Sequence, residues 1–330
     1  MKALYLMPDN IFQLVYGEKQ RKELESILEF IGPQLNKDSL ENFPKEKLAE
    51  TEIIISSWGM PEMNDKILAL FPNLKIIFYG AGSVKNFTTE AMWKKGIRIV
   101  SAWAANAVPV AEFAFAQIIL SLKNFWYASK IYKEQRGKKI PINPFGAYDV
   151  NIGLISLGMI GKMVLEKLKT LDVNIFAYDP FVNEEQAKEL GCKILTLDEL
   201  FQKSHVISCH TPWLKETEKM IKSKHFEYMI PGATFINTAR GAVVDEKGMI
   251  DVLKKRHDIF AVLDVTWPEP PSNDSELYEL PNVFLSPHIA GSMGNECRRM
   301  AQYIVEEVKR FINGEKLKYE ITEELSKKLA

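Results

Sequence analysis

Short apolar runs alternate with longer amphipathic segments along most of this 330-residue chain. In the first hundred residues the apolar runs lie at 3–6, 52–56, 75–80 and 98–102, and helix-patterned segments such as 17–30 and 88–95 separate them. Residues 108–133 carry one continuous apolar periodicity, which predicts a single long helix. A polar stretch with Gly and Pro at 134–149 predicts a loop after it.

The second half repeats the alternation more regularly. Strand-like runs lie at 151–156, 173–178, 193–195, 204–209, 233–237, 259–263 and 283–286, with helical segments between most of them. This order is typical of a parallel sheet with crossover helices, so we predict an α/β fold. Near the end, Met300, Ile304, Val308 and Phe311 share one helical face and Gly314 predicts the helix end. Such a helix can pack back on the first block, so the domain boundaries need not be simple cuts in the sequence.

Composition narrows the classes of partner. Lys plus Arg number 42 against 43 for Asp plus Glu, which gives no reason to expect nucleic acid or an anionic membrane as a partner. The longest apolar segment is interrupted by Glu112 and Gln117, so no membrane span is predicted. Three widely spaced cysteines without a C-x-x-C predict neither a disulfide framework nor a metal site and fit a reducing cytoplasm.

The stretch NIGLISLGMIGK at 151–162 nearly matches the dinucleotide fingerprint G-x-G-x-x-G. Gly158 and Gly161 hold its second and third glycine positions, while Ser156 takes the first, which works if the φ of Ser156 is negative. A helix starting near Met159 would direct backbone N–H groups at a pyrophosphate. Asp179 follows Ser156 by 23 residues, close to the spacing of about 20 at which an acid binds the ribose hydroxyls. An acid there repels a 2′-phosphate, so we predict NAD rather than NADP.

Other polar residues follow the remaining strands, and ligands of open α/β sheets bind at that edge. Among them, His288 suits proton exchange with a hydroxyl group, since its ordinary pKa is about 6.5. Glu269 could orient the ring of His288, and Arg240 offers a two-pronged grip on a carboxylate. His210 is open between a contact with the cofactor and a packed core position.

Several motifs in order resemble the D-isomer-specific 2-hydroxyacid dehydrogenases: SLGMIG with YDP, CHTPWLKET, NTARGAVVDEKGMIDVL, LDVTWPEPP and LPNVFLSPHIAGS, over about residues 75–300. The resemblance implies an NAD-dependent interconversion of a D-2-hydroxy acid and its 2-oxo acid. It implies that Arg240 binds substrate, that Glu269 pairs with the acid/base His288, and that the backbone around Ala81 and Gly82 takes the substrate carboxylate. The residues that would line NAD are Gly158, Met159, Ile160, Asp179, His210, Pro212, Thr238, Ala239, Asp264, Ala290 and Gly291, with Asp264 holding the carboxamide.

The family also implies two Rossmann-like domains with parallel sheets and a homodimer. Residues 105–291 would form the NAD-binding domain, inserted into a split substrate domain at 1–104 and 292–330. Departures such as the loop FYGAGSVKNF leave the substrate open among glyoxylate, hydroxypyruvate, larger 2-oxo acids and phosphoglycerate. An alternative is an NAD(H)-sensing corepressor or scaffold protein on the same fold, because such relatives can keep the same residues. An S-adenosylmethionine methyltransferase also uses a glycine turn and an acid, but it gives no reason for the later Arg, Glu and His.

Overall fold

The computed structural model describes residues 1–137 and 142–328, and it divides the chain into two compact units. Unit 1 contains residues 1–107 and 292–330, and unit 2 contains residues 108–291. From the sequence, the boundaries are predicted after residues 104 and 291; the first division in the structure follows Ala107, within the helix α6 (Trp103–Leu122). Residues 138–141, which belong to the predicted loop at 134–149, lie outside the described part.

Unit 1 is built on a six-stranded sheet with the order β13-β5-β4-β3-β1-β2. Its strands pair in parallel except for β13, which is antiparallel to β5 at one edge. Its strands are β1 (Lys2–Tyr5), β2 (Glu29–Phe30), β3 (Ile53–Ser56), β4 (Ile76–Tyr79), β5 (Arg98–Ser101) and β13 (Glu320–Ile321). Its helices are α1 (Asp9–Val15), α2 (Glu18–Glu25), α3 (Lys45–Ala49), α4 (Asp65–Leu68), α5 (Glu90–Lys94), α13 (Cys297–Ile312) and α14 (Glu323–Lys328).

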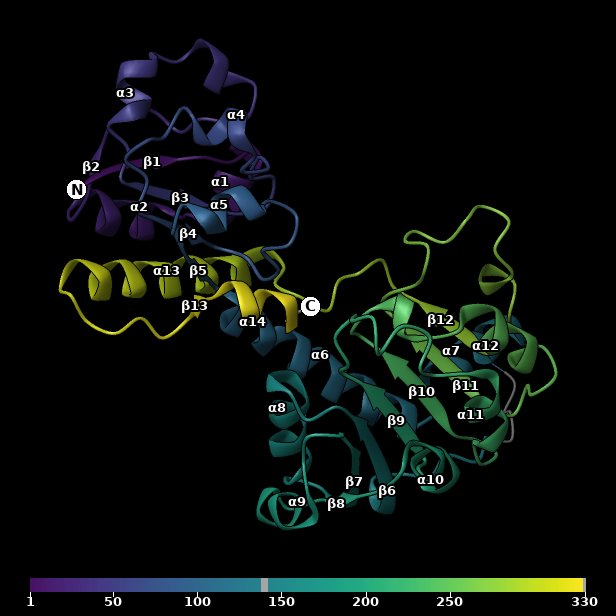
Figure 1. The fold of residues 1–330 in the computed structure, drawn as a ribbon. Coiled ribbons are helices and arrows are strands. Elements are labelled where there is room, and N and C mark those ends of the chain that lie inside the picture. Colours follow the sequence, from purple (N-terminus) through teal and green to yellow (C-terminus); the bar gives the residue numbers. More distant parts are fainter. Residues whose placement is uncertain (138–141, 329–330) are drawn as a thin grey trace. The chain divides into compact units, whose positions relative to one another are not determined.

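Helix α13, from the second segment of unit 1, completes the core of this unit (Figure 1). It packs against α1, α2 and β4, and the predicted face residues Met300, Ile304 and Val308 are fully buried there. Helices α3, α4 and α5 contribute Leu48, Leu68 and others to a second apolar cluster. Segments distant in sequence therefore share one core, as a split domain requires.

Unit 2 is a doubly wound sheet of seven strands in the order β12-β11-β10-β9-β6-β7-β8, and each of these strands pairs in parallel with its neighbours. The strand order reverses between β6 and β9, which is where such sheets bind ligands. Its strands are β6 (Tyr148–Ile155), β7 (Asp172–Tyr178), β8 (Lys193–Ile194), β9 (Val206–Cys209), β10 (Thr234–Asn237), β11 (Phe260–Leu263) and β12 (Val283–Leu285). Its helices, besides most of α6, are α7 (Phe125–Glu134), α8 (Met159–Leu168), α9 (Glu184–Leu190), α10 (Leu197–Lys203), α11 (Ser223–Tyr228) and α12 (Glu246–Leu253).

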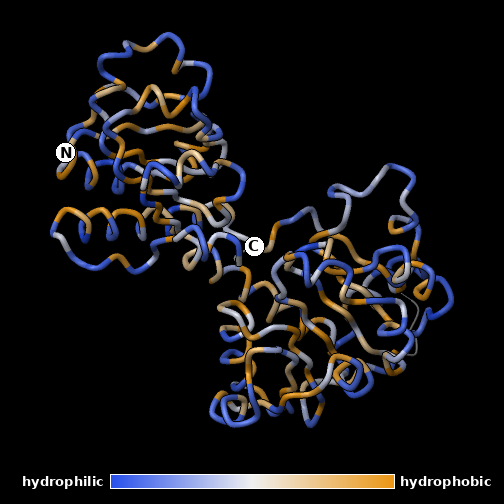
Figure 2. Tube along the Cα trace, viewed as in Figure 1, coloured by the Kyte–Doolittle hydropathy of each residue, from blue (hydrophilic) through white to orange (hydrophobic). Residues whose placement is uncertain are grey.

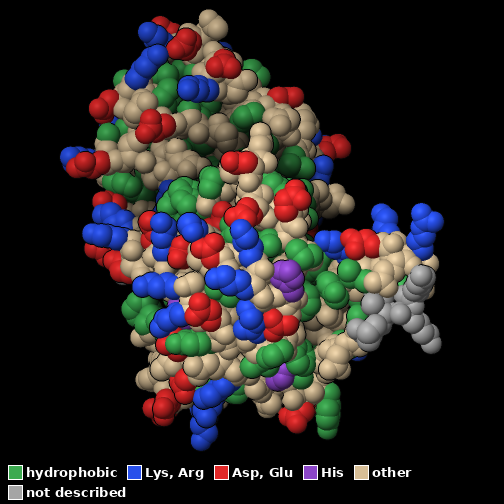
Figure 3. Space-filling model, turned by 90° about the vertical axis from the view of Figure 1, so that its right-hand side faces the viewer, with side chains coloured by type: hydrophobic (Ala, Val, Ile, Leu, Met, Phe, Trp, Pro, Cys, Tyr) green, Lys and Arg blue, Asp and Glu red, His purple; other side chains and the backbone are tan. Residues whose placement is uncertain are grey.

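Helices cover both faces of this second sheet. Apolar side chains of α6 and α8 form one cluster with β6 and β7, and those of α10, α11 and α12 form another with β9 and β10. Figure 2 shows the hydrophobic strands lying inside each unit, with hydrophilic segments along the outer loops and helices. On the face in Figure 3, basic and acidic side chains are interspersed, in keeping with the balanced composition.

The prediction of a single helix over residues 108–133 is wrong. The structure has two helices, α6 and α7, which are separated at Asn124, whose φ of 50° is left-handed and ends the helical ladder. Asn tolerates this conformation better than most residues do, so a break there costs little. By length and composition α6 is the one helix of the described residues that could cross a membrane, but 56% of its apolar window is buried inside the protein.

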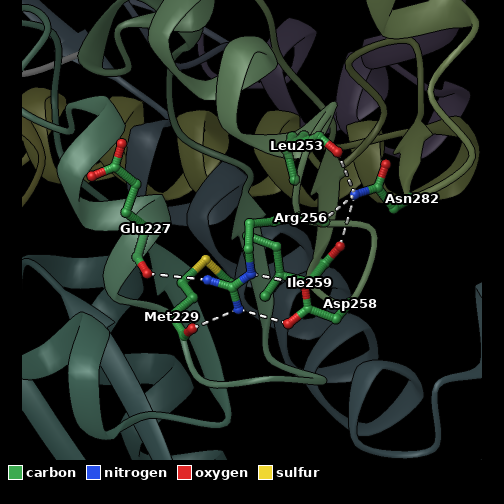
Figure 4. Close-up of polar contacts among 7 residues, drawn as sticks. All are labelled: Glu227, Met229, Leu253, Arg256, Asp258, Ile259 and Asn282. Atoms are coloured by element: carbon green, nitrogen blue, oxygen red, sulfur yellow. Dashed lines mark hydrogen bonds and ion pairs between the residues drawn. The ribbon is translucent and has the colours of Figure 1, made fainter.

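The amino-terminal edge of β10–β12 is closed by the network in Figure 4. The Arg256 guanidinium forms an ion pair with Asp258 at 2.7 Å and donates to the carbonyls of Glu227 and Met229. Asn282 Nδ2 lies within 3.2 Å of three backbone carbonyls that precede β11. The donors of Arg256 and Asn282 Nδ2 thus bind within the fold at this edge, while the predicted site residues follow the strands at the opposite, carboxyl-terminal edge.

Candidate active site

The turn between β6 and α8 is built around a close backbone approach. A Cβ added at Gly161 would lie 2.1 Å from the carbonyl oxygen of Ser156, so only glycine fits. A Cβ at Gly158 would meet nothing within 4 Å, which leaves open space in front of the first turn of α8. The amino end of a helix with open space before it is suited to a pyrophosphate.

The backbone conformation of Ser156 differs from the one predicted from the sequence. Its φ is 74°, not negative, so serine here adopts the left-handed conformation that glycine takes more readily. Three hydrogen bonds hold this turn: Ser156 N–H donates to Tyr178 O at 2.8 Å, the hydroxyls of Ser156 and Thr211 lie 2.9 Å apart, and Leu157 N–H donates to Asp179 Oδ2 at 2.7 Å. These hydrogen bonds hold Ser156 in a backbone conformation that is costly for a residue with a Cβ.

Asp179 stands at the end of β7 beside this turn. Besides the bond from Leu157, its Oδ1 accepts the N–H of Phe181 at 2.8 Å. The residue is half-buried. Each carboxylate oxygen keeps a further lone pair, so a ribose hydroxyl can still be bound there.

Two buried groups at the same sheet edge lack partners among the described residues. They are both ring nitrogens of His210, which follows β9, and the hydroxyl of Thr238, which follows β10. Burial lowers the pKa of His210 to about 4, so its ring is neutral. Unsatisfied buried polar groups are rare in folded proteins, and a bound ligand is one reason for them. Together with the open space at Gly158, they fit a dinucleotide.

Arg240 is fixed by its neighbours in the turn after β10. The side chain of Asn237 donates to Arg240 O and accepts the N–H of Ala239, each at 3.0 Å. A Cβ at Gly241 would lie 2.0 Å from the backbone of Thr266, so the turn packs directly on the segment that follows β11. Burial lowers the pKa of Arg240, and the charge of Glu269 opposes that shift.

Asp264, at the end of β11, organises the loop that carries His288. Its carboxylate accepts Ser286 Oγ at 2.6 Å, Ile289 N–H at 2.9 Å and Ala290 N–H at 2.8 Å. Its own carbonyl accepts the N–H of His288 at 3.0 Å. The side chain is 2% exposed, so these bonds are shielded from water.

His288 and Glu269 lie close together in the loops that follow the strands at this edge. His288 Nδ1 lies 2.5 Å from Glu269 Oε1, and the side chains are 48% and 34% exposed. The φ of His288 is 52°, an unusual value that clusters at functional sites. Glu246, at the start of α12, accepts the N–H of Trp267 at 2.9 Å and so anchors the loop that leads to Glu269; burial raises the pKa of Glu246.

Most of the predicted residues gather at the carboxyl edge of the unit 2 sheet. They are Gly158, Met159, Ile160, Asp179, His210, Pro212, Thr238, Ala239, Arg240, Asp264, Glu269, His288, Ala290 and Gly291. Ala81 and Gly82 belong to unit 1, in the loop after β4. The pattern of the sequence did not single out Asn237, Glu246 and Ser286, because their roles come from hydrogen bonds across the fold. In the described residues, no group of three or more His, Cys, Asp or Glu could hold a metal ion.

Comparison with known proteins agrees with this architecture. Residues 115–290 match the family described as D-isomer specific 2-hydroxyacid dehydrogenase, NAD binding domain. The D-3-phosphoglycerate dehydrogenase of Archaeoglobus fulgidus is 31% identical over 298 residues, which cover 88% of this chain and 56% of that protein. That of Methanocaldococcus jannaschii is 28% identical over 271 residues, covering 82% and 51%. The chain thus spans about half the length of these relatives.

Solved structures share the fold along nearly the whole chain. The structure of D-2-hydroxyisocaproate dehydrogenase has a TM-score of 0.77 and 23% identity, covering 98% of this chain and 100% of that one. D-lactate dehydrogenase from Aquifex aeolicus, solved with NAD and lactic acid, has a TM-score of 0.70 and 25% identity, covering 94% and 96%. The family match spans more than half of the chain and coincides with the sheet that carries the glycine turn. The chain therefore belongs to the D-isomer-specific 2-hydroxyacid dehydrogenase family, and its unit 2 is the NAD-binding domain.

Proposed function

We propose that this protein is an NAD-dependent D-2-hydroxyacid dehydrogenase, which interconverts a D-2-hydroxy acid and its 2-oxo acid. The observation that carries the proposal is the pair His288–Glu269, 2.5 Å apart at the ligand-binding edge of an NAD-binding domain. Arg240, whose charge interacts with Glu269, stands at the same edge. Reduction of a 2-oxo acid requires three groups from the protein: a proton donor, a carboxylate that pairs with this donor, and a cation that binds the substrate carboxylate.

The bound cofactor would supply a hydride to the keto carbon in the reducing direction. The turn at Gly158 and the first turn of α8, with Met159 and Ile160, would hold the pyrophosphate. Asp179 would bind the ribose hydroxyls and disfavour a 2′-phosphate. The remaining predicted contacts are His210, Pro212, Thr238, Ala239, Asp264, Ala290 and Gly291.

His288 would supply the proton. Nδ1–H donates to Glu269 Oε1, which leaves Nε2 to exchange a proton with the substrate oxygen. The carboxylate of Glu269 stabilises the charged ring before the proton leaves and fixes its orientation. Arg240 would bind the substrate carboxylate through its guanidinium, of which Nη1 also donates to Ala239 O at 2.6 Å. The backbone N–H groups at Ala81 and Gly82 are a second predicted contact of the substrate carboxylate. One hydride and one proton thus convert C=O to CH–OH.

The substitutions His288→Ala and Glu269→Gln test these roles. We expect His288→Ala to reduce kcat by at least 100-fold, since acid–base catalysis contributes about 10²–10⁴. NADH affinity, followed by fluorescence titration, should stay within about threefold of the wild type because neither side chain is assigned to the cofactor. His257→Ala is a matched control, since that ring is exposed and lies within hydrogen-bond distance of Lys254 O, away from the predicted site residues. Equal turnover by His288→Ala would refute the assignment.

Two further properties rest on different grounds, the first on the family resemblance and the second on the cysteines. We propose a homodimer and a cytoplasmic location. The three cysteines are free, which fits a reducing compartment. The aromatic side chains of Phe125 and Tyr132 on α7 are 44% and 58% exposed, so they are available to a second copy. Sedimentation analysis at micromolar concentration would test the dimer; a single monomeric species would contradict it.

A further inference from the structure

The loop after β4 in unit 1 is held from behind by two buried serines. Ser57 Oγ donates to the carbonyl of Gly80 at 2.8 Å. The single hydrogen of Ser101 Oγ is shared between the carbonyls of Ala81 and Gly82, at 2.7 and 2.5 Å. Both serines are 0% exposed. Three successive carbonyls are thus turned toward the interior of unit 1.

The two serines come from the strands on either side of the loop. Ser57 directly follows β3 and Ser101 ends β5, and β4 lies between these strands in the sheet. The loop start is also fixed, because Gly80 N–H donates to Ser56 O at 2.7 Å. A Cβ at Gly80 would lie 2.6 Å from the Tyr16 hydroxyl, which itself donates to Ser56 O at 2.8 Å. The loop is therefore held by hydrogen bonds from both neighbouring strands and at its first residue, Gly80.

Peptide geometry fixes the direction of the N–H groups that follow these three carbonyls. In a planar trans peptide the C=O and the following N–H point in opposite directions. Because the carbonyls of residues 80–82 face the serines, the N–H groups of Ala81, Gly82 and Ser83 point away from them. Within the part of the chain that the structure describes, these three N–H groups have no acceptor. Successive free N–H groups of this kind form an anion-binding concavity.

We propose that Ser57 and Ser101 are positioning residues that hold the amides of residues 81–83 as a cradle for the substrate carboxylate. This inference rests on the proposed function and adds two residues to its substrate site. The serines do not touch the substrate; they set the direction of the groups that do. A serine that only stabilised the fold would leave carboxylate affinity unchanged in a folded variant.

The experiment compares Ser57→Ala, Ser101→Ala and Ser56→Ala with the wild type. Ser56 is the matched control, since it is equally buried in unit 1 and its hydroxyl contacts Leu6 O and, at 3.5 Å, Ser57 O, but not the loop of residues 80–83. The Ser56 carbonyl that accepts Gly80 N–H is backbone and is kept in Ser56→Ala. Oxamate, a small carboxylate that resembles a 2-oxo acid, is titrated by calorimetry with NADH saturating. We expect Ser57→Ala and Ser101→Ala each to weaken oxamate roughly tenfold, or about 1.4 kcal/mol, and Ser56→Ala to weaken it less than about twofold.

Kinetics give a second readout. KM for the 2-oxo acid should rise about tenfold in both loop variants while kcat stays within about threefold, because the cradle binds substrate and transition state alike. Oxamate affinity equal to the wild type, or reduced equally in Ser56→Ala, overturns the proposal. So does a wild-type protein that binds no oxamate. If the wild type binds oxamate yet reduces no 2-oxo acid, the proposed activity fails, while the variants still decide on the cradle.

Discussion

Asp264→Asn tests how the fold holds His288 in place. The wild-type carboxylate accepts three hydrogen bonds from the loop of residues 286–290, two on Oδ1 and one on Oδ2. An asparagine keeps one accepting oxygen and replaces the other with an NH2 group. If the oxygen takes the place of Oδ1, the NH2 group faces the buried N–H of Ala290, so a donor meets a donor.

The magnitude follows from the bonds that are lost. A hydrogen bond to a charged group contributes about 1.5–3 kcal/mol, and an unsatisfied buried donor costs about 1–3 kcal/mol. We therefore expect Asp264→Asn to lower the free energy of unfolding by about 3 kcal/mol. For a unit of this size that corresponds to a Tm decrease of about 6–12 °C. Because His288 sits on the loosened loop, kcat should also fall, by at least about tenfold.

Thermal unfolding followed by circular dichroism measures the first effect, and NADH oxidation with a 2-oxo acid measures the second. Asp251→Asn is the control, since its exposed carboxylate forms an ion pair with Lys247 on the surface of α12 and its loss should leave Tm close to that of the wild type. A Tm for Asp264→Asn within about 1 °C of the wild type would refute the reasoning, because three shielded bonds cannot be disturbed at no cost.

Three more substitutions probe the cofactor side. Gly161→Ala should weaken NADH at least about tenfold in a fluorescence titration, because its Cβ would lie 2.1 Å from Ser156 O and open the turn; unchanged affinity would contradict this. Asp179→Asn should narrow the preference for NADH over NADPH about tenfold in kcat/KM, and an unchanged ratio would remove its ribose role. The pKa of His210 is about 4 in the folded protein, below the ordinary value of about 6.5, so the unfolded chain binds the proton first. Stability is then lost as the pH falls from about 6.5 to 4, and between pH 7 and 4 the wild type should lose about 3 kcal/mol more than His210→Gln in urea unfolding; equal losses would contradict a buried neutral ring.

Much of the fold could be predicted from the sequence because buried strands leave a local pattern. The apolar runs at 151–156, 173–178 and 233–237 correspond to β6, β7 and β10 within a few residues. The glycine turn could also be predicted, since Gly161 is required by its close contact with Ser156, only five residues earlier in the chain.

The rest depends on partners that no local pattern reveals. The apolar periodicity of the sequence continues through Asn124, so it predicts one helix, although the backbone breaks the helix at this residue. The left-handed φ of Ser156 is stabilised by Thr211 and by the chain near Asp179, both distant in sequence. Likewise, Ser57 and Ser101 act on a loop 19 to 23 residues away. Such residues are found by following hydrogen bonds, not by reading motifs.

We propose above that the protein reduces a 2-oxo acid with NADH to the D-2-hydroxy acid. The most direct measurement is NADH oxidation by the wild-type protein against glyoxylate, hydroxypyruvate, larger 2-oxo acids and phosphohydroxypyruvate, with NADPH in parallel and chiral analysis of the product. We expect turnover with at least one acid, much faster with NADH, and a D product wherever the product is chiral. Tight NADH binding without turnover of any acid would contradict the claim and favour an NAD(H)-sensing protein on the same fold.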